Sequence, residues 1–93
     1  VTLVHHCAAV TYSGAPSTMA ERVNVGGAYE VLELGRCSRQ LGRIVQWSTL
    51  FATGAEGGVL REDVLLEPSS TGLLHTRYRA ERLMARAMHE LPI

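Results

Sequence analysis

Apolar positions along the chain alternate between short β-type runs and longer helical patterns. Residues 1–10 begin with a continuous, β-branched apolar run, which predicts a strand buried on both faces, as in a parallel sheet. Residues 43–49 form a second run of β-branched and aromatic residues and predict a second strand. Residues 91–93 are typical of the start of a third strand.

The first helical pattern covers residues 18–37. Thr18 and Glu21 have the spacing of a capping box, in which both side chains satisfy free backbone donors. Gly26 and Gly27 in the middle of this helix lower its propensity by about 1–2 kcal/mol. Because glycines lower the stability of a helix, their presence here predicts that the helix packs closely against a sheet or a ligand.

The second helical pattern covers residues 73–90. Its apolar positions recur every three or four residues and predict one buried stripe: Ala80, Leu83, Met84, Ala87, Met88 and Leu91. On the charged side, Arg82 and Arg86 repel each other one turn apart, whereas Arg86 and Glu90 attract. Residues 51–72 before this helix form a connection long enough to be functional or disordered, and its inner part, Val59–Leu66, is expected to dock on the body.

The order strand, helix, strand, long connection, helix and strand start predicts parallel strands joined by right-handed crossovers. The 93 residues suffice for one domain, so we expect a single α/β domain over residues 1–93. Ligands of such sheets bind beyond the carboxyl ends of the strands. Here those ends are the segments Cys7–Ala9 and Ser48–Thr49.

The charge balance excludes several classes of partner. Nine basic residues, all arginine, balance nine acidic ones, so no basic field predicts binding to nucleic acid or to an anionic membrane. No apolar run approaches the roughly 20 residues that span a bilayer. Lysine is absent, which excludes any mechanism on this chain that needs a lysine ammonium.

The cysteine and histidine content predicts neither a disulfide framework nor a metal site. Cys7 and Cys37 each lie in an apolar segment and are expected to be buried, reduced thiols. The adjacent His5, His6 and Cys7 would point in different directions, so we expect one packed and one polar-facing histidine and no metal. The first ten residues lack the pattern of a signal peptide, which favours the cytoplasm. Both ends look cut from a longer chain.

Four segments, read in order, resemble the second half of an extended short-chain dehydrogenase/reductase. His6–Ala9 resembles the small-residue segment after the family's fourth strand, and Asn24–Gly27 resembles its Asn-x-x-Gly-Thr helix motif. Ser48–Thr49 resembles the strand end that carries the catalytic serine, and residues 76–83 resemble the helix that carries the tyrosine and lysine. The stretch 48–63 is most similar to the thioester and fatty-acyl reductase branch.

This resemblance implies a partial Rossmann-type parallel sheet that lacks the first βαβ unit. It implies NADP or NAD as the cofactor of a longer parent protein, which would transfer a hydride to a carbonyl or an acyl thioester. In that parent, Ser48 would bond the developing oxyanion, and Asn24 would support an active-site water or the helix bend. The backbone of Cys7, Ala8 and Ala9 would line the nicotinamide side of the cofactor.

The resemblance also contains two departures at the catalytic pair. Aligning on Ala80–Glu81 places Leu73 where the family has its proton-transferring tyrosine and Arg77 where it has lysine. Arginine keeps the positive charge and could hold the nicotinamide ribose with different geometry. A second frame uses Tyr78 and Arg82, also four residues apart, but it breaks the Ala-Glu register.

A glycine-rich turn for the pyrophosphate is missing from this sequence. We therefore expect the chain alone to be inactive and to bind NADPH more weakly than about 1 mM, if at all. Because Leu3, Val4, Val45 and Trp47 would be poorly covered in half a sheet, self-association is expected. The alternative is a non-catalytic interaction module that pairs through the exposed edge of its first strand.

Overall fold

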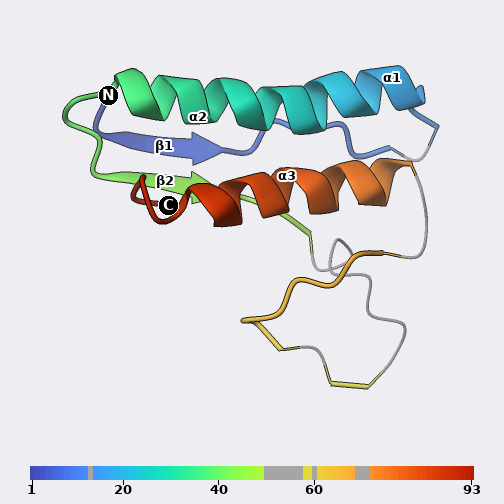
Figure 1. Cartoon of the computed structure of the whole chain (residues 1–93). Helices are drawn as coiled ribbons and strands as arrows, with labels where there is room; N and C mark the ends of the chain where they lie inside the picture. Colours follow the sequence, from blue (N-terminus) through green and yellow to red (C-terminus); the bar gives the residue numbers. More distant parts are fainter. Residues whose placement is uncertain (13, 50–57, 60, 69–71) are drawn as a thin grey trace.

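The computed structural model describes residues 1–12, 14–49, 58–59, 61–68 and 72–93 (Figure 1). Its elements, in chain order, are β1 (Leu3–His6), α1 (Ser17–Ala20), the π-helical segment η1 (Glu21–Gly26), α2 (Gly27–Cys37), β2 (Arg43–Gln46) and α3 (Leu73–Ala87). The predicted strand–helix–strand–helix order is confirmed. Both strands are shorter than predicted, since each keeps four residues.

The two strands form a parallel sheet in which Leu3 pairs with Arg43 and His6 pairs with Gln46. The predicted third strand is not formed as a strand over residues 91–93. Its first residues nevertheless lie beside β2, because the backbone N–H of Ile44 donates to the carbonyl of Pro92 at 2.7 Å. The chain end therefore lies on the side of β2 opposite β1, where a third parallel strand would begin.

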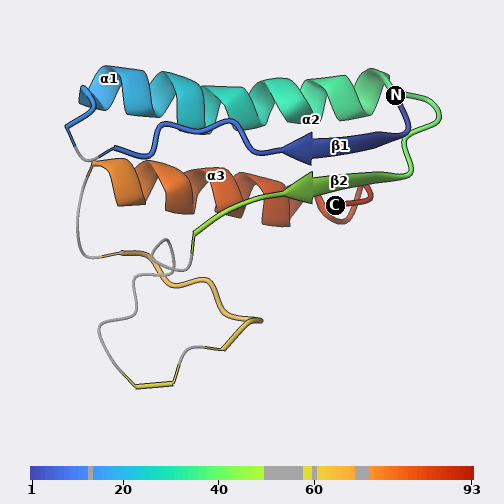
Figure 2. The ribbon, with the colours of Figure 1, turned by 180° about the vertical axis from the view of Figure 1, so that it is seen from behind.

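The two faces of the sheet differ in what covers them. Ile44, only 1% exposed, and His6, 7% exposed, lie on the face that packs against α2. On the opposite face Leu3 and His5 are exposed, and Trp47 beyond the strand is 55% exposed. The prediction of a first strand buried on both faces is therefore wrong, because the described residues place helices on one face only (Figures 1 and 2).

The core lies between α2, α3 and this covered face. Small residues let the two helices approach each other, and larger ones fill the remaining space: Ala28, Leu32, Ala80, Met84 and Ala87 form one buried cluster. The predicted stripe of α3 is confirmed except at Met88, which is 59% exposed at the end of the helix.

Close approach of helix and sheet occurs at Gly35, two residues before the end of α2. A Cβ atom there would lie 3.0 Å from Cδ1 of Ile44 and 3.4 Å from Cδ2 of Leu41. At Gly27, where the sequence predicted close packing, a Cβ would be an ordinary 3.8 Å from Nε2 of His6. The close approach thus falls two turns later than predicted.

The first helix begins without the predicted capping box. Pro16 precedes Ser17 at the helix start, and no side chain caps the first turn. Glu21 instead accepts two hydrogen bonds from Nη1 of Arg79 in α3, at 2.6 and 2.7 Å. A bond between helices has therefore replaced the local one.

The long connection between β2 and α3 lies partly outside the described residues. Within its described part, Val59 is 94% exposed, while Leu65 is half-buried and Pro68 is buried. The expectation that Val59–Leu66 docks on the body therefore holds at Leu65 but not at Val59. Along the described residues, no helix is long and apolar enough to cross a membrane.

Candidate functional site

The candidate site lies beyond the carboxyl ends of β1 and β2. The first turn of α3 reaches the same end of the sheet, since α3 runs antiparallel to the strands (Figure 2). Cys7 and Ala8 directly after β1 are exposed and Ala9 is half-buried. Both cysteines, Cys7 and Cys37, are free and exposed, so the prediction of buried thiols is wrong. The chain leaves β1 at Cys7 and ends α2 at Cys37, and neither position is covered.

Asn24 joins the segment after β1 to the first turn of α3. Its side chain is buried within η1, where Oδ1 accepts from the backbone N–H of Val10 at 2.8 Å. Its Nδ2 donates to the carbonyl of Val10 at 3.2 Å and to Oγ1 of Thr76 at 2.9 Å. The Thr76 hydroxyl in turn donates to the carbonyl of Leu73 at 2.7 Å. Asn24 thus fixes two backbone segments of the candidate site relative to each other.

This arrangement also gives a physical reason for the π-helical segment. A π-turn lengthens the loop of backbone between hydrogen-bonded residues, and such turns are frequent at functional sites. Here it carries Asn24 at 2% exposure, against both Val10 and Thr76. The helix that carries this motif therefore contains a π-helical turn at Asn24.

Ser48 reaches α3 rather than open solvent. Its Oγ donates to Oε2 of Glu81 at 2.7 Å, although the serine itself is exposed. Leu73, Arg77 and Glu81 are four residues apart and so follow one row along α3. Arg77 is half-buried and lies between the turn held by Asn24 and the turn bonded to Ser48.

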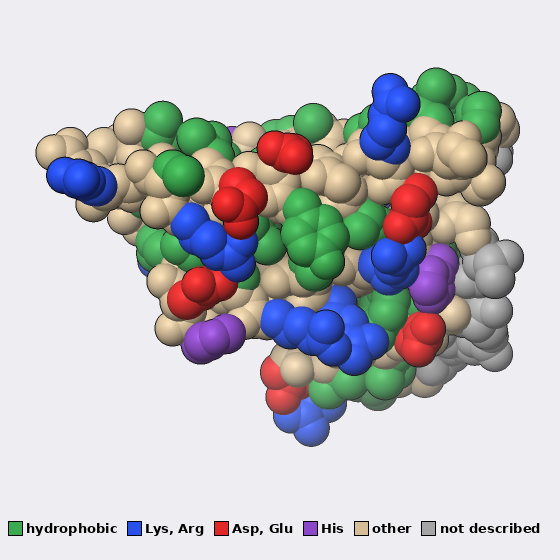
Figure 3. All heavy atoms as spheres, turned by 45° about the horizontal axis from the view of Figure 1, so that its top comes forward, with side chains coloured by type: hydrophobic (Ala, Val, Ile, Leu, Met, Phe, Trp, Pro, Cys, Tyr) green, Lys and Arg blue, Asp and Glu red, His purple; other side chains and the backbone are tan. Residues whose placement is uncertain are grey.

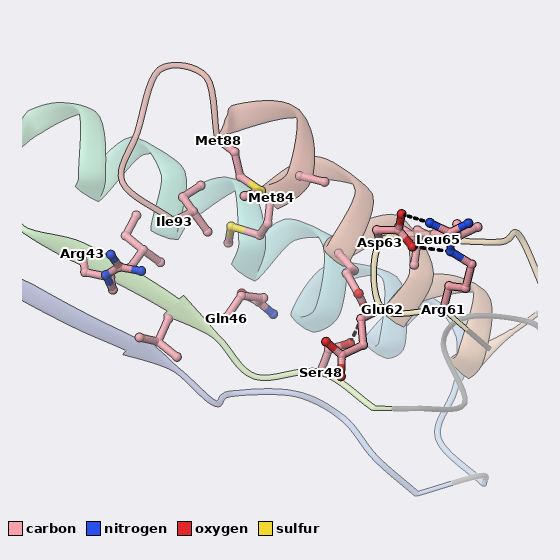
Figure 4. Close-up of a pocket in the computed structure, with 15 residues that line it drawn as sticks. Arg43, Gln46, Ser48, Arg61, Glu62, Asp63, Leu65, Met84, Met88 and Ile93 are labelled. Carbon is pink, nitrogen blue, oxygen red and sulfur yellow. Dashed lines mark hydrogen bonds and ion pairs between the residues drawn. The ribbon is translucent and has the colours of Figure 1, made fainter. Parts of the chain in front are cut away.

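A cavity of about 650 Å³ opens beside Ser48 (Figure 4). Residues of β2, the segment 61–65 and one side of α3 line it, among them Gln46, Glu81, Met84 and Met88. Its wall is largely apolar along α3, whereas Arg61 and Asp63 form an ion pair at 2.6 Å on the opposite side. Ser48 and Glu81 therefore place a polar pair at the rim of an apolar hollow.

The second frame for the catalytic pair uses Tyr78 and Arg82 of α3. Tyr78 is 6% exposed, and its ring lies 5.9 Å from that of His75 on the same helix. Arg82 is exposed and lines a different hollow, together with Tyr29 of α2. The two residues follow one row along α3 and differ in exposure, and neither lines the cavity beside Ser48; Leu73 and Arg77 do not line it either.

Among the predicted site residues, the structure links Asn24 to the turn of Leu73 and links Ser48 to α3. Sequence reasoning missed two residues that make these links, Thr76 and Glu81. Their positions in the sequence indicated that they lie near the site, because Thr76 directly precedes Arg77 and Glu81 follows Arg77 by one turn. The predicted split of the histidines is confirmed: His6 is buried and bonds Oε1 of Gln46 through Nδ1 at 2.7 Å, while His5 is exposed.

The segment between β1 and α1 begins with small side chains and contains a single glycine. Cys7 and Ala8 at the end of β1 are exposed, and Ala9 is half-buried. Between β1 and α1 the only glycine is Gly14, so a glycine-rich phosphate cradle is not found there. The described part of the chain also holds no group of three or more histidine, cysteine or acidic residues that could bind a metal ion.

Comparison with solved structures identifies the architecture. The chain is similar to UDP-glucuronic acid 4-epimerase from Bacillus cereus, solved in complex with NAD, with a TM-score of 0.80 and 22% sequence identity. The match covers 98% of this chain and 29% of the epimerase. The chain therefore has the α/β fold of part of a Rossmann-type nucleotide-binding domain. Nothing among curated proteins matches it.

The sequence itself matches a protein family over its whole length. Residues 1–93 fit the profile of an NAD-binding family described as Male sterility protein. This match agrees with the resemblance to extended short-chain dehydrogenases/reductases, and it identifies a nicotinamide dinucleotide as the cofactor of the parent fold. The chain therefore belongs to this NAD-binding family.

Proposed function

We propose that these residues form the second half of the cofactor domain of an NAD(P)H-dependent reductase that acts on a carbonyl or an acyl thioester. The observation that carries the proposal is the buried bonding of Asn24, which ties the segment after β1 to the first turn of α3. This bonding holds Cys7–Ala9 and Arg77 at one end of the sheet, where a nicotinamide and its ribose would need them.

Each site residue then has a defined task in the parent protein. The nicotinamide, when bound, would supply the hydride. The Arg77 guanidinium would donate to the ribose hydroxyls, which accept hydrogen bonds from a fixed cation. The Ser48 hydroxyl would donate to the oxygen that gains charge as the carbonyl is reduced. For that donation, the Ser48 hydroxyl would rotate away from Glu81, whose Oε2 accepts its hydrogen bond in the free protein.

The proton-transferring position is the weak point of this site, because Leu73 has no proton to give. Restoring the family's pair with Leu73→Tyr and Arg77→Lys in the longer parent protein should raise turnover, measured as loss of NADPH absorbance. Tyr78→Phe is the matched control and should cost at most about 1 kcal/mol of stability, with turnover unchanged. A fall of about a hundredfold on Tyr78→Phe, or about 2.7 kcal/mol of transition-state stabilisation, would contradict this assignment.

The chain by itself is proposed to be inactive and to bind NADPH more weakly than about 1 mM. The reason is that the phosphate cradle belongs to the half of the domain that these residues do not include. A fluorescence titration of the chain with NADPH measures this directly. Micromolar affinity would overturn the view that the other half is needed. We further propose a cytoplasmic location, with the nicotinamide cofactor and the acyl or carbonyl substrate as the parent's binding partners.

A second candidate function is a non-catalytic module that pairs through its sheet. The exposed face around β1, with Leu3 at 55% and Trp47 at 55% exposure, favours this candidate, as does the loss of tyrosine at position 73. Either way the uncovered sheet supports self-association of the isolated chain. Light scattering at about 100 μM, where a small domain with such a face should associate, measures it. A monodisperse monomer with a cooperative melt would contradict it.

A further inference from the structure

A groove runs between the helices on a different side of α3 from Ser48. Two hollows of about 680 and 190 Å³ share Val25, Tyr29 and Arg79 as lining residues and so form one continuous depression. We call it the helical groove. Its further residues used below are Arg22, Arg82, Leu83 and Arg86. Figure 3 shows this helical face, where arginine side chains gather beside hydrophobic ones.

The helical groove carries positive charge that the described residues leave uncompensated. Arg79 is neutralised by Glu21, to which its Nη1 donates twice. Within the described part of the chain, Arg22, Arg82 and Arg86 form no ion pair. Three cations therefore line the groove without an ion-pair partner, and Glu21, the one carboxylate among its lining residues, is bonded to Arg79.

The sequence predicted that Glu90 would pair with Arg86, and the structure contradicts this. The Glu90 carboxylate accepts from Nη2 of Arg36 at 2.6 Å instead, and this bond lowers the pKa of Glu90 below its usual value. Arg82 and Arg86 remain as two like charges one turn apart, an arrangement that destabilises a helix. An anion bound between them would remove this repulsion.

The helical groove also offers an apolar contact between its charges. The Tyr29 side chain is 54% exposed at the centre of the groove, above buried Val25 and beside half-buried Leu83. Tyrosine and arginine are the residue types most enriched at the energetic centres of protein interfaces. The groove therefore combines an aromatic anchor with flanking cations.

We propose that the helical groove binds an acidic polypeptide segment with an apolar side chain between its carboxylates. The apolar side chain would pack on Tyr29 and Leu83, and the carboxylates would bond Arg82 and Arg86 on one side and Arg22 on the other. A single small anion would leave the other cations unmatched, because the arginines are spread along both helices. A second copy of this groove would bring arginines against arginines, which electrostatic complementarity opposes.

The test uses a fluorescein-labelled peptide with the repeat Glu-Glu-Leu, and its binding to the chain is followed by fluorescence anisotropy. Arg82→Glu combined with Arg86→Glu should weaken binding at least about tenfold, since each attraction becomes a repulsion. Arg39→Glu combined with Arg43→Glu is the matched control, because both arginines are exposed and neither lines the helical groove. This double variant should weaken peptide binding less than about twofold, because its charges act on the peptide only at long range and are screened by salt. Tyr29→Ser should weaken peptide binding about tenfold, because it removes the aromatic side chain on which the apolar side chain of the peptide would pack.

Further measurements separate this proposal from its alternatives. Circular dichroism melts check that each variant is folded, and Arg82→Gln with Arg86→Gln repeats the test without introducing acids. The proposal is overturned if the control pair weakens binding as much as the groove pair, or if Tyr29→Ser changes nothing. It is also overturned if inorganic phosphate alone displaces the peptide at equal concentration, which indicates a small-anion site. Phosphatidylserine vesicles that bind the chain more tightly than the peptide, with the same dependence on Arg82 and Arg86, would identify a membrane surface instead.

Discussion

Replacing Asn24 tests whether its buried bonds hold the candidate site together. Asn24→Leu keeps the size of the side chain but removes all three hydrogen bonds to Val10 and Thr76. Two backbone groups of Val10 would then lack their partner in a buried setting, and each costs about 1–3 kcal/mol. The hydroxyl of Thr76 keeps its bond to the carbonyl of Leu73, so it adds little. We expect the free energy of unfolding to fall by about 2–6 kcal/mol.

Urea unfolding followed by circular dichroism measures this change. The midpoint should fall while the slope of the free energy with urea stays the same, because the surface exposed on unfolding is unchanged. Thr76→Val removes one of the three bonds of Asn24 and also the bond of the Thr76 hydroxyl to the carbonyl of Leu73. It should cost about 1–3 kcal/mol and gives a second reading if Asn24→Leu does not fold. The two substitutions should be non-additive, since they remove a shared bond.

Thr18→Val is the matched control, because Thr18 is exposed and caps no backbone group. It should change the stability by less than about 0.5 kcal/mol. If Asn24→Leu falls within about 0.5 kcal/mol of this control, the bonds of Asn24 do not stabilise the fold and the reasoning above fails.

Two further predictions concern glycines and pH. Gly26→Ala should raise the free energy of unfolding by about 0.5–1 kcal/mol, since a Cβ there has no neighbour closer than 4.0 Å. Gly35→Val should lower the free energy of unfolding by about 1–3 kcal/mol, because Ile44 already lies 3.0 Å from the Cβ position. Thermal melts of the two variants should therefore shift in opposite directions. Because Arg36 lowers the pKa of Glu90 in the folded chain, the unfolded chain takes up the proton first as the pH falls. The stability from this pair is therefore present at neutral pH and lost in the acidic range, and Glu90→Gln should flatten that part of a plot of urea midpoint against pH; an unchanged plot would contradict it.

Local patterns predicted the elements of this fold well. The β-branched runs and the 3.6-residue stripe gave the order of strands and helices, because burial of one face repeats along each element. The parallel pairing of β1 and β2 followed from that alternation alone. These features depend on neighbouring residues, which a sequence displays directly.

Predictions failed where a distant residue competed for a side chain. Glu21 has the spacing of a capping box, yet it bonds Arg79, which lies 58 residues away. Glu90 is one turn from Arg86, yet it bonds Arg36, 54 residues away. In both cases the packing of two helices brings an arginine of one helix to a carboxylate that lies far away in the sequence. No spacing rule contains that information.

The bonding partners of the candidate site residues could not be predicted from the sequence. Asn24 and Ser48 were identified by motif, and their partners Thr76 and Glu81 emerged only when α3 was placed against η1 and β2. The exposure of the cysteines was missed for a related reason, since an apolar neighbourhood in sequence does not ensure a covering element in space.

The pairing of β1 with β2 has a consequence for how fast this chain can fold. The side chains of His6 and Gln46, which bond across the two strands, are 40 residues apart, and the bond that joins η1 to α3 spans 52 residues. Contacts of such long range require the closure of large loops before any stabilising burial is gained, and domains built on them fold slowly for their size. During synthesis β1 and β2 can pair once β2 has emerged. Asn24 and Glu21 can form their bonds to α3 only after that helix has been synthesised. We therefore expect this part of a ribosome-bound chain to remain incompletely folded, and accessible to chaperones, until α3 emerges.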